Sequence, residues 1–184
     1  MKIESLKSLD GVEIKGPLVI VPDIFSDSRG LFFESWNMNK FNEHISKNVE
    51  FVQDNHSESF LGVLRGLHYQ LDPYPQGKLV RCVNGRIFDV AIDIRENSPT
   101  FSKWVGLELN QNNKKQLWIP RGFAHGFLTL SQSADVLYKA TGLWNKKCER
   151  TIKWNDLDIN IKWPLKELRN NPTQLSEKDL NAPS

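Results

Sequence analysis

The sequence predicts an all-β protein, a sandwich or barrel, and two observations carry that prediction. From residue 17 to residue 154, short runs rich in Val, Ile, Phe, Leu and Trp are broken at close intervals by Gly, Pro, Asn, Asp or Ser, which is typical of successive short strands. Asn84-Gly85 stands between two such runs, residues 78–83 and 86–95, and this dipeptide predicts a tight antiparallel hairpin. No repeat or long linker divides the chain, so we expect one domain over residues 1–184.

The predicted elements follow in chain order. Residues 18–21 form an apolar run of strand length, and residues 37–46 predict a short helix because Met38, Phe41 and Ile45 fall at helical spacing behind a potential Asn37 cap. Further strands are expected at residues 63–70, on either side of residue 84 and at 135–141. Pro120 and Gly122 predict a sharp entry into another strand, which presents His125. Residues 86–95 are apolar on both faces, so that strand should lie between two apolar layers. The polar stretch 165–179 predicts one or two short helical turns.

Composition excludes several classes of protein. The 24 basic and 22 acidic side chains give a net charge of +2, too balanced to predict a nucleic-acid surface. No apolar run approaches the roughly 18 residues of a membrane span. The chain starts without an apolar leader and has only Cys82 and Cys148, which favours the cytoplasm and free thiols.

One cluster of residues indicates proton-transfer chemistry. Arg65 and His68 precede Lys78 on neighbouring predicted strands. An imidazole can accept a proton at neutral pH, and a fixed cation can hold the oxyanion formed when a C–H bond beside a ketone breaks. A buried structural histidine is the alternative, but two cations beside it would be costly to bury without an anion.

A second cluster surrounds His125. The spacing Pro120-x-Gly122-x-x-His125 resembles the second motif of the cupins, small β-sandwich barrels. The first motif of metal-binding cupins supplies His-x-His, whereas this chain has a single histidine there, so we expect no metal and no cofactor. A metal-dependent cupin using both histidines with Gln70 or Asp72 is the alternative.

Two aromatic residues complete the set. Tyr138, in the strand 135–141, could donate a proton across a pocket, and Trp144 offers a flat face to a nucleobase. Either could instead serve only packing.

Eight strings in order resemble one family, and the match extends over nearly the whole chain. They are FSDSRGLFFESW (25–36), FVQDNHS (51–57), VLRGLHYQ (63–70), QGKLVRCVNGRIFDVAIDIR (76–95), SPTF (98–101), QLWIPRGFAHGF (116–127), LYKAT (137–141), and the late IKWPL and LSEKD. The chain closely resembles the dTDP-4-dehydrorhamnose 3,5-epimerases. The resemblance implies a metal-free, cupin-type jelly roll, usually a homodimer. It also implies that C3 and C5 of dTDP-4-keto-6-deoxy-D-glucose are inverted on the way to dTDP-L-rhamnose.

The resemblance also implies residue roles. His68 is then the general base, Asp179 the carboxylate that orients it, Lys78 the holder of the C4 oxyanion and Tyr138 the acid on the opposite face of the sugar. The Arg29 position reaches a neighbouring subunit's site in this family. The substrate-contacting positions are Arg29, Glu34, Gln53, Asp54, Asn55, Arg65, His125, Trp144, Glu149 and Lys178.

Near relatives leave alternatives open. This chain has Leu143-Trp144 where relatives often carry paired tyrosines, so the fit of the base is less certain than the chemistry. A C3-only epimerase of a related nucleotide 4-keto sugar would share the same catalytic residues. A non-catalytic module that binds sugar nucleotides is the alternative outside enzymes.

Overall fold

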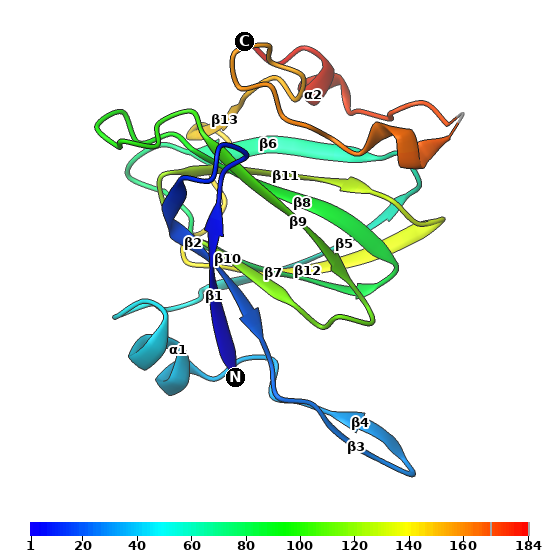
Figure 1. Cartoon of the computed structure of the whole chain (residues 1–184). Helices are drawn as coiled ribbons and strands as arrows, with labels where there is room; N and C mark the ends of the chain where they lie inside the picture. Colours follow the sequence, from blue (N-terminus) through cyan, green and yellow to red (C-terminus); the bar gives the residue numbers. More distant parts are fainter. Residues whose placement is uncertain (170, 184) are drawn as a thin grey trace.

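Two antiparallel sheets face each other in the computed structural model, which describes residues 1–169 and 171–183 (Figure 1). The six-stranded sheet has the order β1 (Lys2–Lys7), β2 (Glu13–Val21), β10 (Gln116–Ile119), β7 (Lys78–Asn84), β12 (Ser133–Ala140) and β5 (Gln53–Phe60). The five-stranded sheet has the order β13 (Glu149–Thr151), β6 (Leu64–Gln70), β11 (Phe123–Thr129), β8 (Arg86–Asp93) and β9 (Trp104–Asn110). The predicted all-β sandwich of the cupin type is confirmed, with sheets that do not close into a barrel.

The predicted Asn84-Gly85 hairpin is wrong. β7 pairs with β10 and β12, whereas β8 pairs with β9 and β11, so this turn carries the chain from one sheet to the other. Among the described residues near the turn only Gly85 has a positive φ, 73°, whereas a type I′ hairpin turn needs positive φ at both central positions. A Cβ at Gly85 would lie 2.1 Å from the carbonyl oxygen of Ser133, so close backbone approach also requires this glycine.

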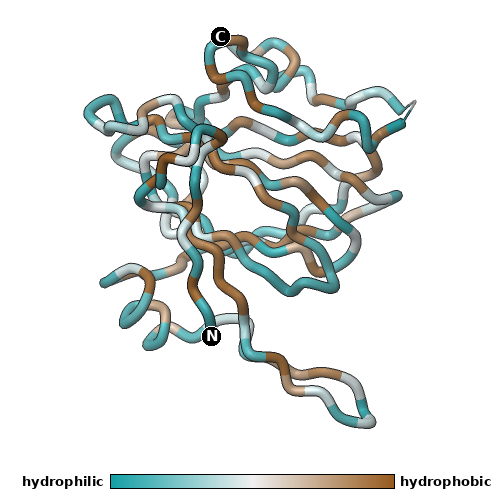
Figure 2. Tube along the Cα trace, viewed as in Figure 1, coloured by the Kyte–Doolittle hydropathy of each residue, from teal (hydrophilic) through white to brown (hydrophobic). Residues whose placement is uncertain are grey.

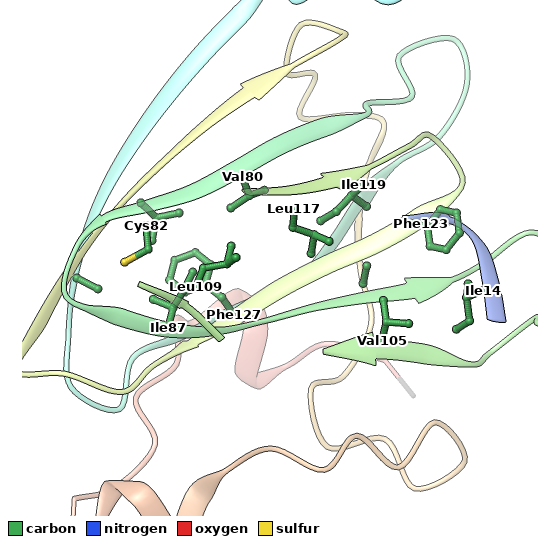
Figure 3. Close-up of a cluster of buried hydrophobic side chains, with 13 residues drawn as sticks. Ile14, Val80, Cys82, Ile87, Val105, Leu109, Leu117, Ile119, Phe123 and Phe127 are labelled. Atoms are coloured by element: carbon green, nitrogen blue, oxygen red, sulfur yellow. The ribbon is translucent and has the colours of Figure 1, made fainter. Parts of the chain in front are cut away.

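Three clusters of apolar side chains hold the two sheets together and attach the segments that pack on their outer faces. The first lies between the sheets and includes Val80, Ile87, Leu117 and Phe127 (Figure 3). The second covers the outer face of the five-stranded sheet, where the segment after β13 packs through Trp163. β8 contributes to both clusters because its side chains alternate, which confirms the two apolar layers predicted around it.

The third cluster joins α1 (Met38–His44) to the outer face of the six-stranded sheet. The Asn37 side chain accepts a hydrogen bond from the Lys40 amide at 3.2 Å, as the predicted cap requires. Phe41 packs edge-on against Trp118 with ring centroids 5.1 Å apart. The predicted C-terminal turns are present as a 3-10 helix, η1 (Leu165–Leu168), and α2 (Glu177–Leu180).

A two-stranded arm leaves the body of the molecule. β3 (Phe25–Asp27) and β4 (Gly30–Phe32) form a hairpin that projects away from both sheets, on the side opposite α2 (Figure 1). Its stem is apolar and its tip hydrophilic (Figure 2), and Phe25 and Phe32 are 65% and 70% exposed. The arm and β1 were not predicted from the sequence.

No helix within residues 1–169 and 171–183 is long and apolar enough to cross a membrane. Cys82 and Cys148 are free thiols, as expected.

Candidate active site

Four strands point polar side chains into the space between the sheets. His68 on β6 and His125 on β11 are direct partners across the five-stranded sheet. Lys78 and Tyr138 come from the facing sheet, and the Lys78 ammonium lies 5.8 Å from the centroid of the Tyr138 ring. Strand alternation explains this placement, because Leu67 and Tyr69 pack on the opposite, outer face.

His68 is paired with a carboxylate from the C-terminal helix. Its Nε2 lies 2.6 Å from Asp179 Oδ1, and the His68 side chain is 26% exposed while that of Asp179 is only 4% exposed. The burial of Asp179 opposes ionisation, but the hydrogen bond and charge of His68 outweigh it and lower the pKa of the carboxyl. An ionised Asp179 orients the imidazole and stabilises its protonated form.

His125 has its own buried carboxylate. Asp89 on β8 is 0% exposed, and its two oxygens lie 3.0 and 3.1 Å from His125 Nε2. Burial lowers the pKa of His125 despite this partner, with Lys78 and His68 adding to the effect, so the ring is neutral at neutral pH. Asp89 was not predicted as part of the site, although a carboxylate in the middle of an apolar strand indicates a buried group that needs a hydrogen-bond partner.

Burial also shifts the pKa values of the two groups on the facing sheet. Desolvation lowers the pKa of Lys78 to about 8, against the opposing charges of Asp89 and Glu149. Desolvation raises the pKa of Tyr138 above its ordinary range. At neutral pH the site therefore presents a cation and a protonated phenol facing the paired imidazole.

Other predicted substrate contacts lie around this centre. The Arg65 guanidinium is on the same strand as His68 and donates from Nε to Ser59 Oγ at 2.9 Å. Glu149, on β13 beside β6, forms an ion pair of 2.7 Å with Lys178, the residue before Asp179. Gln53 and Asn55 are joined side chain to side chain at 2.9 Å on β5, and the backbone amide of Trp144 donates to Gln53 Oε1.

Three predicted contact residues lie elsewhere in this chain. Arg29 is at the tip of the β3–β4 arm, where it pairs with Asp27. Glu34 is held by Lys40 at the start of α1, and Asp54 pairs with Lys139 on the outer face of the six-stranded sheet. A single chain does not bring these side chains to His68, and their contact with a substrate stays a prediction.

Both histidines bond to carboxylates. Within residues 1–169 and 171–183, no group of three His, Cys, Asp or Glu side chains is arranged to hold a metal ion. The Gln70 amide is bonded to backbone groups on three sides, at Tyr74, Leu143 and Asn145. The chemistry available from these groups is acid–base: a paired imidazole on one sheet, and a cation for an oxyanion and a phenol on the facing sheet.

Fold and site together define a class of protein, a cupin-like β-sandwich with acid–base groups gathered between its sheets. A family model described as dTDP-4-dehydrorhamnose 3,5-epimerase matches residues 11–184. A dTDP-4-dehydrorhamnose 3,5-epimerase of Shigella flexneri is 57% identical over 170 residues, 92% of this chain and 91% of that protein. The chain belongs to the dTDP-4-dehydrorhamnose 3,5-epimerase family and is an isomerase.

Solved structures agree with this assignment. The epimerase of Legionella pneumophila, in complex with dTDP-4-keto-L-rhamnose, is 44% identical with a TM-score of 0.89, over 99% of this chain and 92% of that one. A 3'-monoepimerase of Streptomyces bikiniensis, in complex with dTDP-quinovose, is 30% identical with a TM-score of 0.85, over 93% of this chain and 84% of that one.

Proposed function

We propose that this enzyme inverts C3 and C5 of dTDP-4-keto-6-deoxy-D-glucose and releases dTDP-4-keto-L-rhamnose for the synthesis of dTDP-L-rhamnose. The single observation that supports this best is the His68–Asp179 pair on one sheet, facing Lys78 and Tyr138 on the other. Protons on both carbons beside a C4 ketone are acidified by the same carbonyl, so one base and one oxyanion holder serve both centres in turn.

Each inversion is one proton removal and one proton return. His68 takes the proton from the carbon beside the ketone, the C–H electron pair moves into the C4 carbonyl, and the Lys78 ammonium holds the resulting enolate oxygen. Tyr138 then gives its proton to the same carbon from the opposite face, so the configuration inverts. Solvent restores both groups, and no redox partner is consumed.

We assign the remaining polar groups to substrate binding. Arg65 and Lys178 present cations that suit a diphosphate. Trp144, a residue that is 53% exposed, offers its ring as a stacking surface to thymine. The hydrogen-bonded Gln53 and Asn55 on β5, the neutral His125 on β11 and Glu149 on β13 complete the contacts with the nucleotide sugar.

We further propose a cytoplasmic homodimer in which the arm of one chain completes the site of the other. The arm carries exposed Phe25 and Phe32, apolar side chains that a partner would cover. Arg29 at its tip is 88% exposed in the side chain, and a guanidinium delivered from the partner would add a phosphate contact. Residues 1–184 then act as one domain per subunit.

A C3-only epimerase is the second candidate, favoured by the structural likeness to a 3'-monoepimerase. Proton NMR of dTDP-4-keto-6-deoxyglucose with the protein in deuterated water separates the two. Deuterium at C3 and C5 supports the double epimerase, and deuterium at C3 alone supports the narrower one. No deuterium at either carbon would indicate a binding module, and activity lost to a chelator would indicate a metal-dependent cupin.

A further inference from the structure

Gln70 is a buried residue on β6, the strand that also carries His68. Its side-chain amide contacts two loops. Gln70 is 8% exposed and lies two residues after His68 on β6, on the same face. Its Nε2 donates to the carbonyl oxygens of Tyr74 at 2.6 Å and Leu143 at 3.2 Å, and its Oε1 accepts from the Asn145 amide at 2.6 Å. One side chain therefore uses both donors and its acceptor on backbone groups.

Two of those backbone groups flank Trp144. Leu143 precedes this residue and Asn145 follows it, and the Trp144 amide itself donates to Gln53 Oε1 at 2.8 Å. Three consecutive residues of the loop are thus fixed by side chains from β5 and β6. Trp144 as a whole residue nevertheless remains 53% exposed. An exposed aromatic ring on a fixed backbone loses little conformational freedom when a planar ligand stacks on it.

Hydrogen bonds to Asn145 extend this network to Glu149. Asn145 Oδ1 accepts from the amides of Lys147 and Cys148 at 3.0 and 3.3 Å, and the Asn145 carbonyl accepts from Glu149 at 3.0 Å. This turn leads directly into β13, where Glu149 lies opposite Gln70 on β6. A displaced Asn145 would therefore move both the Trp144 ring and the Glu149 carboxylate.

We propose that Gln70 is a positioning residue for nucleotide recognition, holding Trp144 in place to stack on the base. This inference rests on the proposed function in one respect, the stacking of thymine on Trp144. Because the side-chain polar atoms of Gln70 bond to backbone groups of the loops, its effect is on binding more than on proton transfer. The epimerisation step depends on His68 and Lys78, which its removal leaves in place.

The test measures dTDP binding by calorimetry and steady-state kinetics in Gln70→Met, which keeps the side-chain length and removes the three hydrogen bonds. We expect the Kd of dTDP and the KM of the nucleotide sugar to rise about tenfold, with a much smaller change in kcat. Gln174→Met is the matched control, because that glutamine also donates to a backbone carbonyl, at Leu61, far from Trp144. Gln174→Met should leave the Kd of dTDP and the KM of the nucleotide sugar unchanged.

A double-mutant cycle separates this inference from the proposed function. If Gln70 acts through Trp144, Gln70→Met should add almost nothing to the weakened dTDP binding of Trp144→Ala. Full additivity, or unchanged binding in Gln70→Met alone, would overturn the inference. Unchanged binding in Trp144→Ala would instead reject the stacking role on which it rests.

Hydrogen exchange provides a readout that needs no variant. The Trp144 and Asn145 amides should be protected in the free wild-type protein, because each donates to a glutamine side chain. Exchange at the rate of an unstructured peptide, becoming slow only with dTDP, would mean that the ligand orders the loop and Gln70 does not.

Discussion

Asp179 follows His68 by 111 residues, yet their side chains meet at 2.6 Å. The C-terminal segment makes this contact by crossing the outer face of the five-stranded sheet and ending in α2. The Ser176 side chain caps that helix through the Asp179 amide at 3.2 Å. The carboxylate that we propose orients His68 thus depends on the docking of α2.

Replacing Asp179 tests this dependence. In Asp179→Asn, the amide can hold the imidazole but cannot stabilise its charged form, so we expect kcat/KM to fall between about 10²- and 10⁴-fold with folding retained. Glu177→Gln, an exposed carboxylate on the same short helix, is the control and should retain activity. Wild-type kinetics in Asp179→Asn would remove this carboxylate from the mechanism.

Lys78 predicts how activity falls at alkaline pH. Desolvation lowers the pKa of this ammonium to about 8, so the cation that we propose holds the oxyanion is present below that pH and lost above it. We expect kcat/KM to decline as the pH rises through about 8. In Lys78→Arg the remaining activity should persist to higher pH, because a guanidinium stays protonated. The measurement is the pH profile of both enzymes, and an unchanged alkaline limb in the variant would assign that limb to another group.

The acid and the base should be separable by isotope exchange. Tyr138→Phe removes the proton donor but leaves His68, so the protein should form product much more slowly, by about 10²-fold or more. Exchange from the base side should remain measurable by NMR in deuterated water. Loss of both exchange and product in this variant would contradict the assignment of Tyr138 as an acid only.

Subunit complementation tests the arm. Consider a heterodimer in which one chain carries Arg29→Ala and the other carries His68→Asn. The site of the Arg29→Ala chain keeps its own His68 and receives an intact Arg29 from the other chain. Random mixing of the two weak homodimers should therefore restore about a quarter of wild-type activity. Activity that stays at the sum of the two parents would mean that Arg29 serves its own chain, or that no mixed dimer forms; mass spectrometry of the mixture distinguishes these.

A buried cluster outside the site predicts pH-dependent stability. Asp93 is 0% exposed, and although burial opposes its ionisation, hydrogen bonds from Arg95, Ser98 and Thr100 lower its pKa to about 2 from 3.8. This stabilisation is complete above the unfolded-state pKa and is lost as the pH falls towards 2. Asp93→Asn should therefore reduce the free energy of unfolding at neutral pH by roughly 2–3 kcal/mol.

Urea unfolding at several pH values measures this effect. The difference between wild type and Asp93→Asn should shrink between pH about 4 and about 2. Asp158→Asn, at an exposed position, should match the wild type throughout. A difference that stays constant over that range would attribute the effect to packing.

Local patterns predicted part of this fold. The helix at α1 and its Asn37 cap follow from short-range rules, as do the strand alternation that turns His68 inward and the two apolar layers around β8. The hairpin predicted at Asn84-Gly85 was wrong because a turn signal specifies a bend in the chain and not which strands pair. The partners of β7 and β8 are chosen by packing between distant segments.

The site was predicted mainly from resemblance, which paired His68 with Asp179, whereas the pairing of His125 with Asp89 required the structure. Neither Asp179 beside His68 nor Asp89 beside His125 is visible in local sequence, because 111 and 36 residues separate the partners. Arg29, Glu34 and Asp54 lie away from the centre, and their contacts with a substrate stay predictions.

The most direct test of the central claim is the rate at which His68→Asn exchanges the protons beside the ketone. Wild type and variant are incubated with dTDP-4-keto-6-deoxyglucose in deuterated water, and deuterium at C3 and C5 is followed by NMR. With His68 as the base, exchange at both carbons should fall by at least about 10²-fold in the folded variant. Deuterium incorporation by the His68→Asn protein at the wild-type rate would contradict the account.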